Sequence, residues 1–96
     1  MTVRDQIQTL RDEILEAAAA NGARHVRLFG SAARGQETEG SDVDLLVTLK
    51  PGRTLLDLAR LETQLERLLN RSVDVVPESG LREPFRRRVL RDAVGV

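Results

Sequence analysis

The sequence contains no cysteine, tryptophan or tyrosine, and only two phenylalanines. Without cysteine the chain cannot form a disulfide framework or a thiolate metal site, and its composition fits a reducing compartment. Because aromatic residues are almost absent, the core must be filled by leucine, valine and alanine, which the hydrophobic content of 41% permits. The composition therefore predicts a folded globular chain with an aliphatic core.

Net charge is also absent, since fifteen basic and fifteen acidic residues cancel. The overall field gives no reason to expect binding to membranes or direct, nonspecific binding to nucleic acid. The chain begins without a basic segment followed by an apolar run, and no stretch approaches the ~18 consecutive apolar residues of a membrane span. We therefore expect a cytoplasmic protein, with residues 1–96 forming a single domain.

Hydrophobic periodicity and turn residues divide the chain into alternating helices and strands. Helices are expected from Thr2 to Asn21, Ser31 to Gly35, Thr54 to Asn70 and Pro84 to Ala93, and strands at His25–Phe29, Asp42–Leu49 and Ser72–Val76. This order predicts an α/β fold in which a sheet of about three strands is flanked by these four helices. The loop between the first two strands permits antiparallel pairing, and the helix between the second and third permits a parallel crossover, so the strand directions stay open.

Two aspartates at the start of the second strand are the first candidates for chemistry. Asp42 and Asp44 are two residues apart, so both carboxylates point to the same face of the strand. Buried together without a partner they would repel each other, and one would tend to be protonated. A divalent cation removes this conflict, and oxygen ligands favour Mg²⁺ or Mn²⁺.

A glycine and a serine after the first strand can provide the other half of such a site. Gly30 has no side chain, so a ligand can approach the backbone closely, and the short helix expected from Ser31 has free N–H groups at its start. These features suit a phosphate group. An anion site next to a metal site is the arrangement needed to bind a nucleoside triphosphate with its cation.

A third aspartate lies in the last predicted strand. Asp74 faces away from Val73 and Val75, and its carboxylate can join those of Asp42 and Asp44 if the second and third strands are neighbours. Three aspartates could hold two metal ions, one activating an attacking hydroxyl and one stabilising the leaving phosphates.

Simpler interpretations exist for each of these residues. Gly-Ser pairs are common in turns, and aspartates on short strands are often only solvated. Arg34 is either a phosphate contact or an exposed charge at a helix end. We interpret His25 as a surface residue, and the Arg86–Arg88 run as a solvated helix face that could alternatively contact an acidic partner. The chain has no Walker A loop, dinucleotide-binding glycine motif, Gly-x-Ser-x-Gly elbow or cysteine nucleophile.

Several segments together resemble a known family. They are Phe29-Gly30-Ser31, Ala33-Arg34-Gly35, the run from Ser41 to Leu46, the strand Val73–Val76 and the arginine-rich segment Leu81–Val94. The first three resemble the Gly-Ser-x10-Asp-x-Asp signature of the DNA polymerase beta nucleotidyltransferase superfamily. The whole set is similar to the minimal nucleotidyltransferase (MNT) antitoxins that pair with HEPN-domain toxins. Val43 and Val75 stand where that family often has Ile or Leu.

This resemblance implies a nucleotidyltransferase fold with a mixed sheet and an adenylyltransferase that uses ATP and Mg²⁺. Gly30 and Ser31 would hold the triphosphate, Asp42 and Asp44 would bind the metals, and Asp74 would complete the metal site and help to activate the acceptor hydroxyl. The implied reaction transfers AMP to a tyrosine of a cognate HEPN ribonuclease toxin. Since this chain contains no tyrosine, that acceptor would lie in the partner.

Two other functions stay open. The chain could be a non-catalytic binding module that silences a toxin by covering its active site. It could also transfer a nucleotide to a small molecule, although the sequence shows no further domain to hold such an acceptor.

Overall fold

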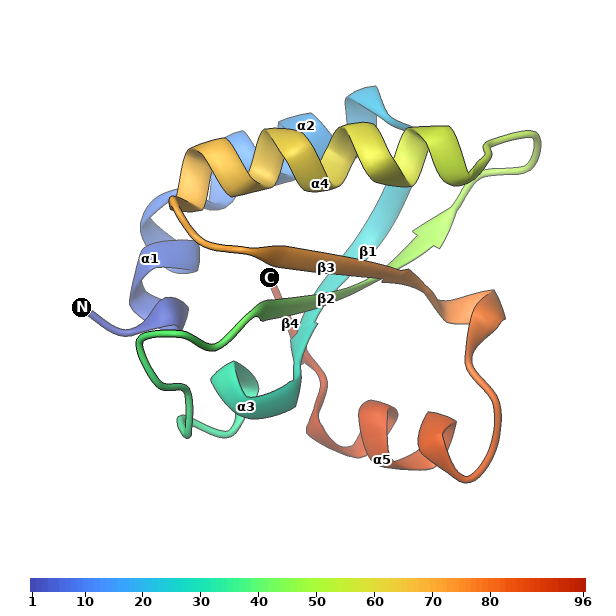
Figure 1. The fold of residues 1–96 in the computed structure, drawn as a ribbon. Helices are drawn as coiled ribbons and strands as arrows, with labels where there is room; N and C mark the ends of the chain where they lie inside the picture. The colour runs from blue at the N-terminus through green and yellow to red at the C-terminus, as the bar shows by residue number, and fades with distance from the viewer.

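The amino-terminal segment folds as two helices in the computed structural model, which describes all 96 residues (Figure 1). α1 (Val3–Thr9) begins with a capping box in which the Asp5 N–H donates to Thr2 Oγ1 at 3.1 Å and the Thr2 N–H donates to Asp5 Oδ2 at 3.2 Å. The prediction of one continuous helix was wrong at Leu10, after which α2 (Arg11–Ala20) starts. Gln6 Nε2 donates to the carbonyl oxygen of Leu69 at 2.6 Å, whereas α2 packs on the sheet, so the two segments follow different directions.

The sheet is mixed and contains four strands in the order β3-β2-β1-β4. They are β1 (Ala23–Phe29), β2 (Val43–Leu49), β3 (Val73–Pro77) and β4 (Val94–Gly95). β1 pairs antiparallel with β2 and with β4, and β2 pairs parallel with β3. Both pairings that the sequence allowed are therefore present, and the strand missing from the prediction is the two-residue β4.

The parallel pair is joined by α4 (Leu55–Leu69), which follows the turn at Pro51 and Gly52. A second capping box starts this helix, and its apolar stripe is buried at Leu58, Leu61, Leu65 and Leu69. The helix ends at Asn70, whose φ of 54° is left-handed, a conformation that asparagine tolerates better than most residues.

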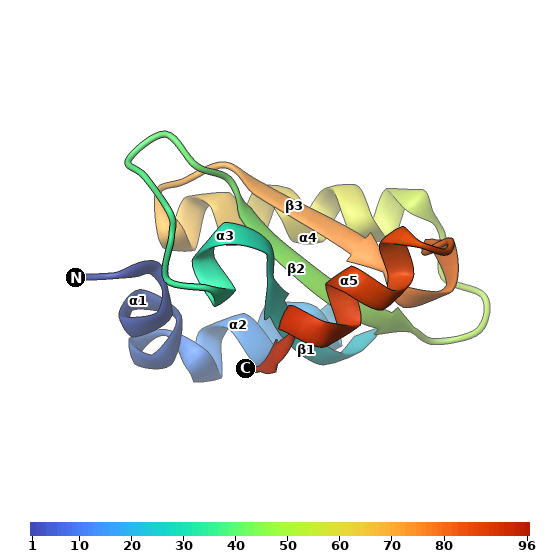
Figure 2. The same ribbon diagram turned by 90° about the horizontal axis from the view of Figure 1, so that it is seen from below.

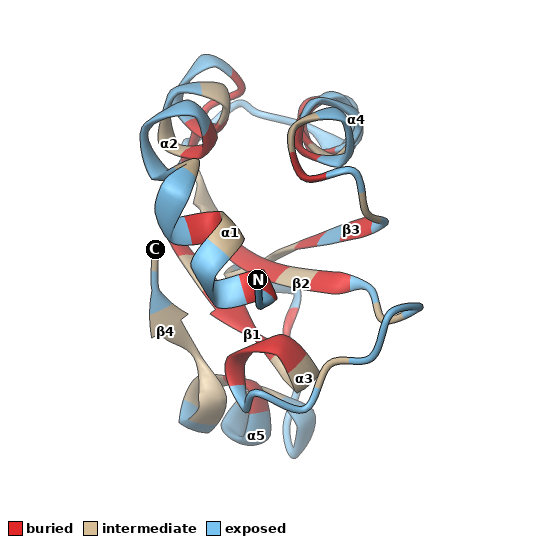
Figure 3. Ribbon diagram, turned by 90° about the vertical axis from the view of Figure 1, so that its left-hand side faces the viewer, coloured by how far each residue is buried: buried red, intermediate tan, exposed pale blue.

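The helices form a layer on each face of the sheet. α2 and α4 cover one face, while the single-turn α3 (Gly30–Ala33) and α5 (Phe85–Asp92) lie on the other (Figures 1 and 2). The main core lies under α2 and α4, whose inner sides are buried (Figure 3). The opposite face has only a small core of Phe29, Leu46, Leu81 and Val89. Because this second layer is small, part of that face is left for polar residues.

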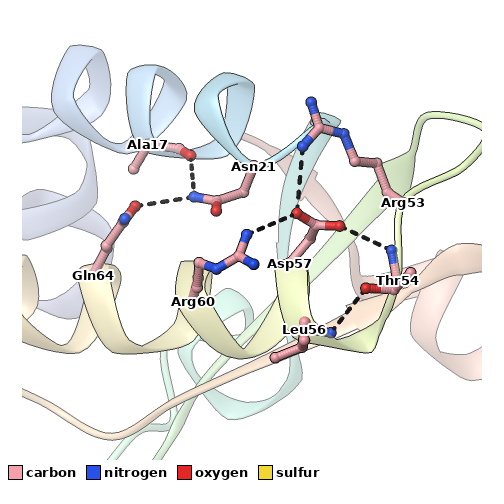
Figure 4. Close-up of polar contacts among 8 residues, drawn as sticks. All are labelled: Ala17, Asn21, Arg53, Thr54, Leu56, Asp57, Arg60 and Gln64. Atoms are coloured by element: carbon pink, nitrogen blue, oxygen red, sulfur yellow. Dashed lines mark hydrogen bonds and ion pairs between the residues drawn. The ribbon is translucent and has the colours of Figure 1, made fainter.

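Polar side chains join the carboxyl end of α2 to α4 (Figure 4). Asn21 Nδ2 donates to the Ala17 carbonyl at 2.9 Å and to Gln64 Oε1 at 3.0 Å. Near the start of α4, Asp57 accepts from the Thr54 N–H at 2.9 Å and pairs with Arg53 and Arg60. The backbone hydrogen bond from Thr54, assisted by the two arginines, lowers the pKa of Asp57 below its ordinary value.

The outer side of β3 is occupied by two glutamates of α4. The Val73 N–H donates to Glu66 Oε2 at 3.1 Å, and the Val75 N–H donates to Glu62 Oε2 at 2.8 Å. These bonds hold β3 against α4, while its other side pairs with β2. No helix of the chain has the length and apolar character needed to cross a membrane.

Candidate active site

The three predicted aspartates lie on the sheet face that carries α3 and α5. In the parallel register of β2 and β3, Asp44 lies directly opposite Asp74, and neighbouring strands are about 4.8 Å apart. Asp42 immediately precedes β2 and, two residues before Asp44, belongs to the same face. The predicted condition that the third strand lies beside the second is confirmed.

Partial burial and the neighbouring carboxylates change the acidity of Asp44. The pKa of Asp44 is raised above its ordinary value, first because the carboxyl group is partly buried and then because the negative charges of Asp74 and Asp42 are close. Arg34 acts in the opposite direction and favours the ionised form. A cation close to Asp44 would therefore favour its ionised form.

Gly30 is in direct contact with Asp44. Phe29 pairs with Asp44 across β1 and β2, and at Gly30 the chain turns out of β1 with a φ of 73°. This left-handed conformation disfavours every residue with a side chain, and a Cβ placed here would overlap the Asp44 carboxylate. Both the backbone conformation and the neighbouring carboxylate thus favour glycine over any residue with a Cβ.

Ser31 has a different local role from the one the sequence suggested. The short helix was expected to begin at Ser31, but α3 begins at Gly30, after an extended Phe29, and has no side-chain cap. Ser31 lies in the first turn, where its carbonyl oxygen accepts from the Gln36 N–H at 2.8 Å. α3 is a single turn, so the positive charge that it can offer an anion comes from a few local N–H groups and not from a long helix dipole.

Arg34, at the carboxyl end of α3, is held by two side chains. Its Nη1 donates to Asp92 Oδ2 at 2.9 Å, and its Nε donates to Gln36 Oε1 at 3.1 Å. Arg34 also borders a cavity of about 220 Å³ between α3 and α5, which is lined by Phe29, Gly30, Arg34, Phe85, Arg88, Val89 and Asp92. The sequence pointed to Arg34, but Gln36, Phe85, Arg88 and Asp92 were missed as neighbours of the site.

The donor set fits a divalent cation that shares its coordination with a substrate. No group of three or more carboxylate or imidazole side chains is arranged so that it could hold a metal ion by itself. Mg²⁺ usually keeps water and phosphate ligands and takes only one or two carboxylates from the protein. Partial burial is the first cause of the raised pKa of Asp44, and the nearby negative charges of Asp74 and Asp42, which also contribute, suit such a cation.

The remaining candidates lie away from the aspartates or are already paired. His25 is exposed, with a φ of 53°, where the pairing of β1 and β2 is irregular between Arg24 and Arg27. In the arginine run, Arg86 Nη2 lies 3.3 Å from Glu78 Oε1 and Arg87 Nε lies 3.8 Å from Glu83 Oε2. Only Arg88 of this run borders the cavity.

Comparisons with known proteins agree with this geometry. A family model for the nucleotidyltransferase domain matches residues 7–94. The protein adenylyltransferase MntA of Thermococcus cleftensis is 43% identical over 78% of this chain and 76% of its own length. A candidate protein adenylyltransferase of Methanocaldococcus jannaschii, MJ0435, is 36% identical over 94% of this chain and 97% of its own.

Solved structures show the same relationship. A candidate minimal nucleotidyltransferase with 47% sequence identity aligns with 100% of this chain and 97% of its own, with a TM-score of 0.88. A toxin–antitoxin complex solved with AMP-PNP contains a chain that shares the fold, with 21% identity over 88% of this chain and 69% of its own, and a TM-score of 0.75. Family match, identity and fold together show that the chain belongs to the nucleotidyltransferase domain family and is a nucleotidyltransferase of the minimal type.

Proposed function

We propose that this chain is a protein adenylyltransferase that transfers AMP from ATP, with Mg²⁺, to a tyrosine of a cognate HEPN ribonuclease toxin and thereby acts as its antitoxin. The observation that carries the proposal is the pairing of Asp44 with Asp74 across β2 and β3, with Gly30 packed against Asp44. The related adenylyltransferases of archaea support the reaction class. The acceptor tyrosine belongs to the partner, because this chain has none.

The substrate has a defined orientation in this proposal. Gly30, Ser31 and Arg34 would bind the triphosphate, while Asp42, Asp44 and Asp74, completed by phosphate and water oxygens, would hold the cations. Mg²⁺, when bound, neutralises the phosphates and stabilises the charge that develops on them during transfer. The α-phosphate would then lie near Asp44 and Asp74, on the sheet face from which a partner protein could present its hydroxyl.

The chemical step is a single displacement at the α-phosphorus. The acceptor oxygen forms a bond to this phosphorus, the bond to the bridging oxygen of the β-phosphate breaks, and pyrophosphate leaves. The proton of the hydroxyl passes to the Asp74 carboxylate and then to water. We place the reaction in the cytoplasm, without membrane association and without direct contact between this chain and nucleic acid.

The test follows label from ATP to the partner. The chain is incubated with Mg²⁺, its toxin and ATP that is labelled at either the α- or the γ-phosphate. We expect the toxin to gain label from the α-phosphate only, to lose ribonuclease activity, and to stay unlabelled when its acceptor tyrosine is replaced by phenylalanine.

Matched variants separate catalysis from binding. Asp42→Asn with Asp44→Asn should abolish labelling, whereas Glu39→Gln, which removes an exposed charge from the same acidic segment, should retain it. If the aspartate variant still silences the toxin at equal abundance, the protein acts by covering the toxin's active site and the proposal is wrong. Repeated labelling of a small acceptor in the absence of any toxin would instead indicate a small-molecule transferase.

A further inference from the structure

Arg34 is held in one orientation by the two hydrogen bonds to Asp92 and Gln36. A guanidinium group has five N–H donors, and these bonds use one on Nε and one on Nη1. The other three donors are left for an external anion. The guanidinium group lines the cavity together with Gly30, and its positive charge favours the ionised form of Asp44. An anion that binds to Arg34 would therefore lie in the candidate active site.

Asp92 occupies a position that is unfavourable for an acid within its own helix. It is the last residue of α5, where the carbonyl ends of the helix carry partial negative charge and basic residues are preferred. Local helix stability therefore does not explain an aspartate here. The ion pair with Arg34 explains it, because Arg34 Nη1 on the other wall of the cavity lies 2.9 Å from Asp92 Oδ2.

The position of Asp92 is fixed by the small core on this face of the sheet. Val89, one turn earlier on α5, is buried with Phe29 and Leu46. Phe29 is adjacent to Gly30, so α5 is packed against the same segment that contacts Asp44. Asp92 thus contacts Arg34 from a helix, α5, that packs next to the segment in contact with Asp44.

We propose that Asp92 is a positioning residue that holds the Arg34 guanidinium for the outer phosphates of the nucleoside triphosphate. This inference rests on the proposed function, since it takes ATP as the substrate. If Asp92 already orders the Arg34 side chain, ATP binding no longer carries the entropic cost of ordering it. This cost is about 0.5–1.5 kcal/mol for each long side chain, which corresponds to an affinity change of about two- to tenfold. Asp92 itself does not touch the reacting atoms.

The test is a double-mutant cycle on nucleotide binding. The dissociation constants of Mg-ATP and of AMP are measured by calorimetry for wild type, Arg34→Gln, Asp92→Asn and the double variant. Asp12→Asn is the matched control, because it removes an aspartate from an exposed arginine pair of 3.9 Å on α2, in the opposite layer. Thermal unfolding of every variant monitors the fold.

We expect Asp92→Asn to weaken Mg-ATP binding about two- to tenfold, to leave AMP binding unchanged, and to have no further effect when Arg34 is already Gln. Asp92→Glu should restore part of the affinity. Asp12→Asn should bind like wild type.

Three results would overturn the inference. Equal loss of AMP and Mg-ATP affinity would mean a general disturbance of the fold. Additive effects of the two substitutions would mean that Asp92 does not act through Arg34. Unchanged or tighter Mg-ATP binding in Asp92→Asn would mean that Asp92 does not help Arg34, or that it competes with the phosphates.

The proposed function is judged separately by transfer to the toxin. If the binding pattern holds and no label reaches the toxin, the inference stands and the adenylylation proposal fails. If label is transferred and Asp92→Asn binds Mg-ATP like wild type, the adenylylation proposal stands and the inference about Asp92 fails. A wild-type chain that binds no Mg-ATP would overturn both.

Discussion

Replacing Gly30 by alanine tests the contact between the first turn of α3 and Asp44, one of the proposed catalytic aspartates. The φ of 73° places Gly30 in the left-handed region, which costs a residue with a Cβ about 1–2 kcal/mol. The unfolded chain loses flexibility at the same time, which returns about 0.4–1 kcal/mol. The added methyl group also overlaps the Asp44 carboxylate, which must rotate away at a further cost of about 1 kcal/mol. We expect Gly30→Ala to lower the free energy of unfolding by about 2 kcal/mol.

Gly52→Ala is the matched control for this prediction. Gly52 has a φ of 87° and open space where its Cβ would lie, so it has the backbone cost without the clash. We expect this variant to lose about 1 kcal/mol of stability and to keep its activity. Gly30→Ala should lose transferase activity about 100-fold, since displacement of a catalytic group by about 1 Å has effects of this size.

The two variants are compared by urea unfolding and by the rate of AMP transfer. Unfolding is followed by far-ultraviolet circular dichroism, because the chain has no tryptophan or tyrosine to report by fluorescence. Transfer is measured at a temperature where both variants are folded. Equal activity of Gly30→Ala and Gly52→Ala would refute the reasoning, since it would show that the Asp44 carboxylate can move without consequence.

Three further substitutions test the energetics of the site, of the small core beside it and of the start of α4. Asp44→Asn should abolish transfer, yet in the absence of metal it should unfold at a higher urea concentration than wild type. Because folding raises the pKa of Asp44, the wild type loses stability as pH rises from 3.8 through the raised value. The difference in stability between variant and wild type should therefore grow over that range. Leu46→Ala should cost about 3 kcal/mol in urea unfolding, since Leu46 is fully buried beneath α5; a loss below about 1 kcal/mol would contradict this packing. Asp57→Asn should lower the urea midpoint at neutral pH and match wild type in acid, because a carboxylate with a lowered pKa contributes stability that is lost as pH falls. A difference in midpoint that does not change with pH would contradict this role of the Asp57 charge.

The active-site strands could be predicted from sequence because strand alternation is a local property. Asp42 and Asp44 share a face because residues two apart on a strand point to the same side. In its own strand, Asp74 points away from the side occupied by Val73 and Val75. Their meeting depended on which strands are neighbours, which the residues permitted and the register of β2 and β3 confirms. The signature of glycine, serine and aspartates added the family, and with it the mixed sheet.

Features set by tertiary packing were not predictable in the same way. Arg34 and Asp92 are 58 residues apart, and only the packing of α5 on the sheet brings them together. β4 has two residues, too few for any alternation to be visible. The break at Leu10 occurs without glycine or proline, because α1 and α2 pack against different parts of the molecule.

The glutamates on the outer side of β3 also determine how the molecule can associate with others. An edge strand with free N–H groups is a template on which a strand of another protein can add, and it is a common origin of aggregation. Glu66 and Glu62 occupy the outward N–H groups of Val73 and Val75, on either side of Asp74. The edge that carries Asp74 is therefore closed to sheet extension, and in the proposed reaction an acceptor protein has to approach the aspartates over the face of the sheet.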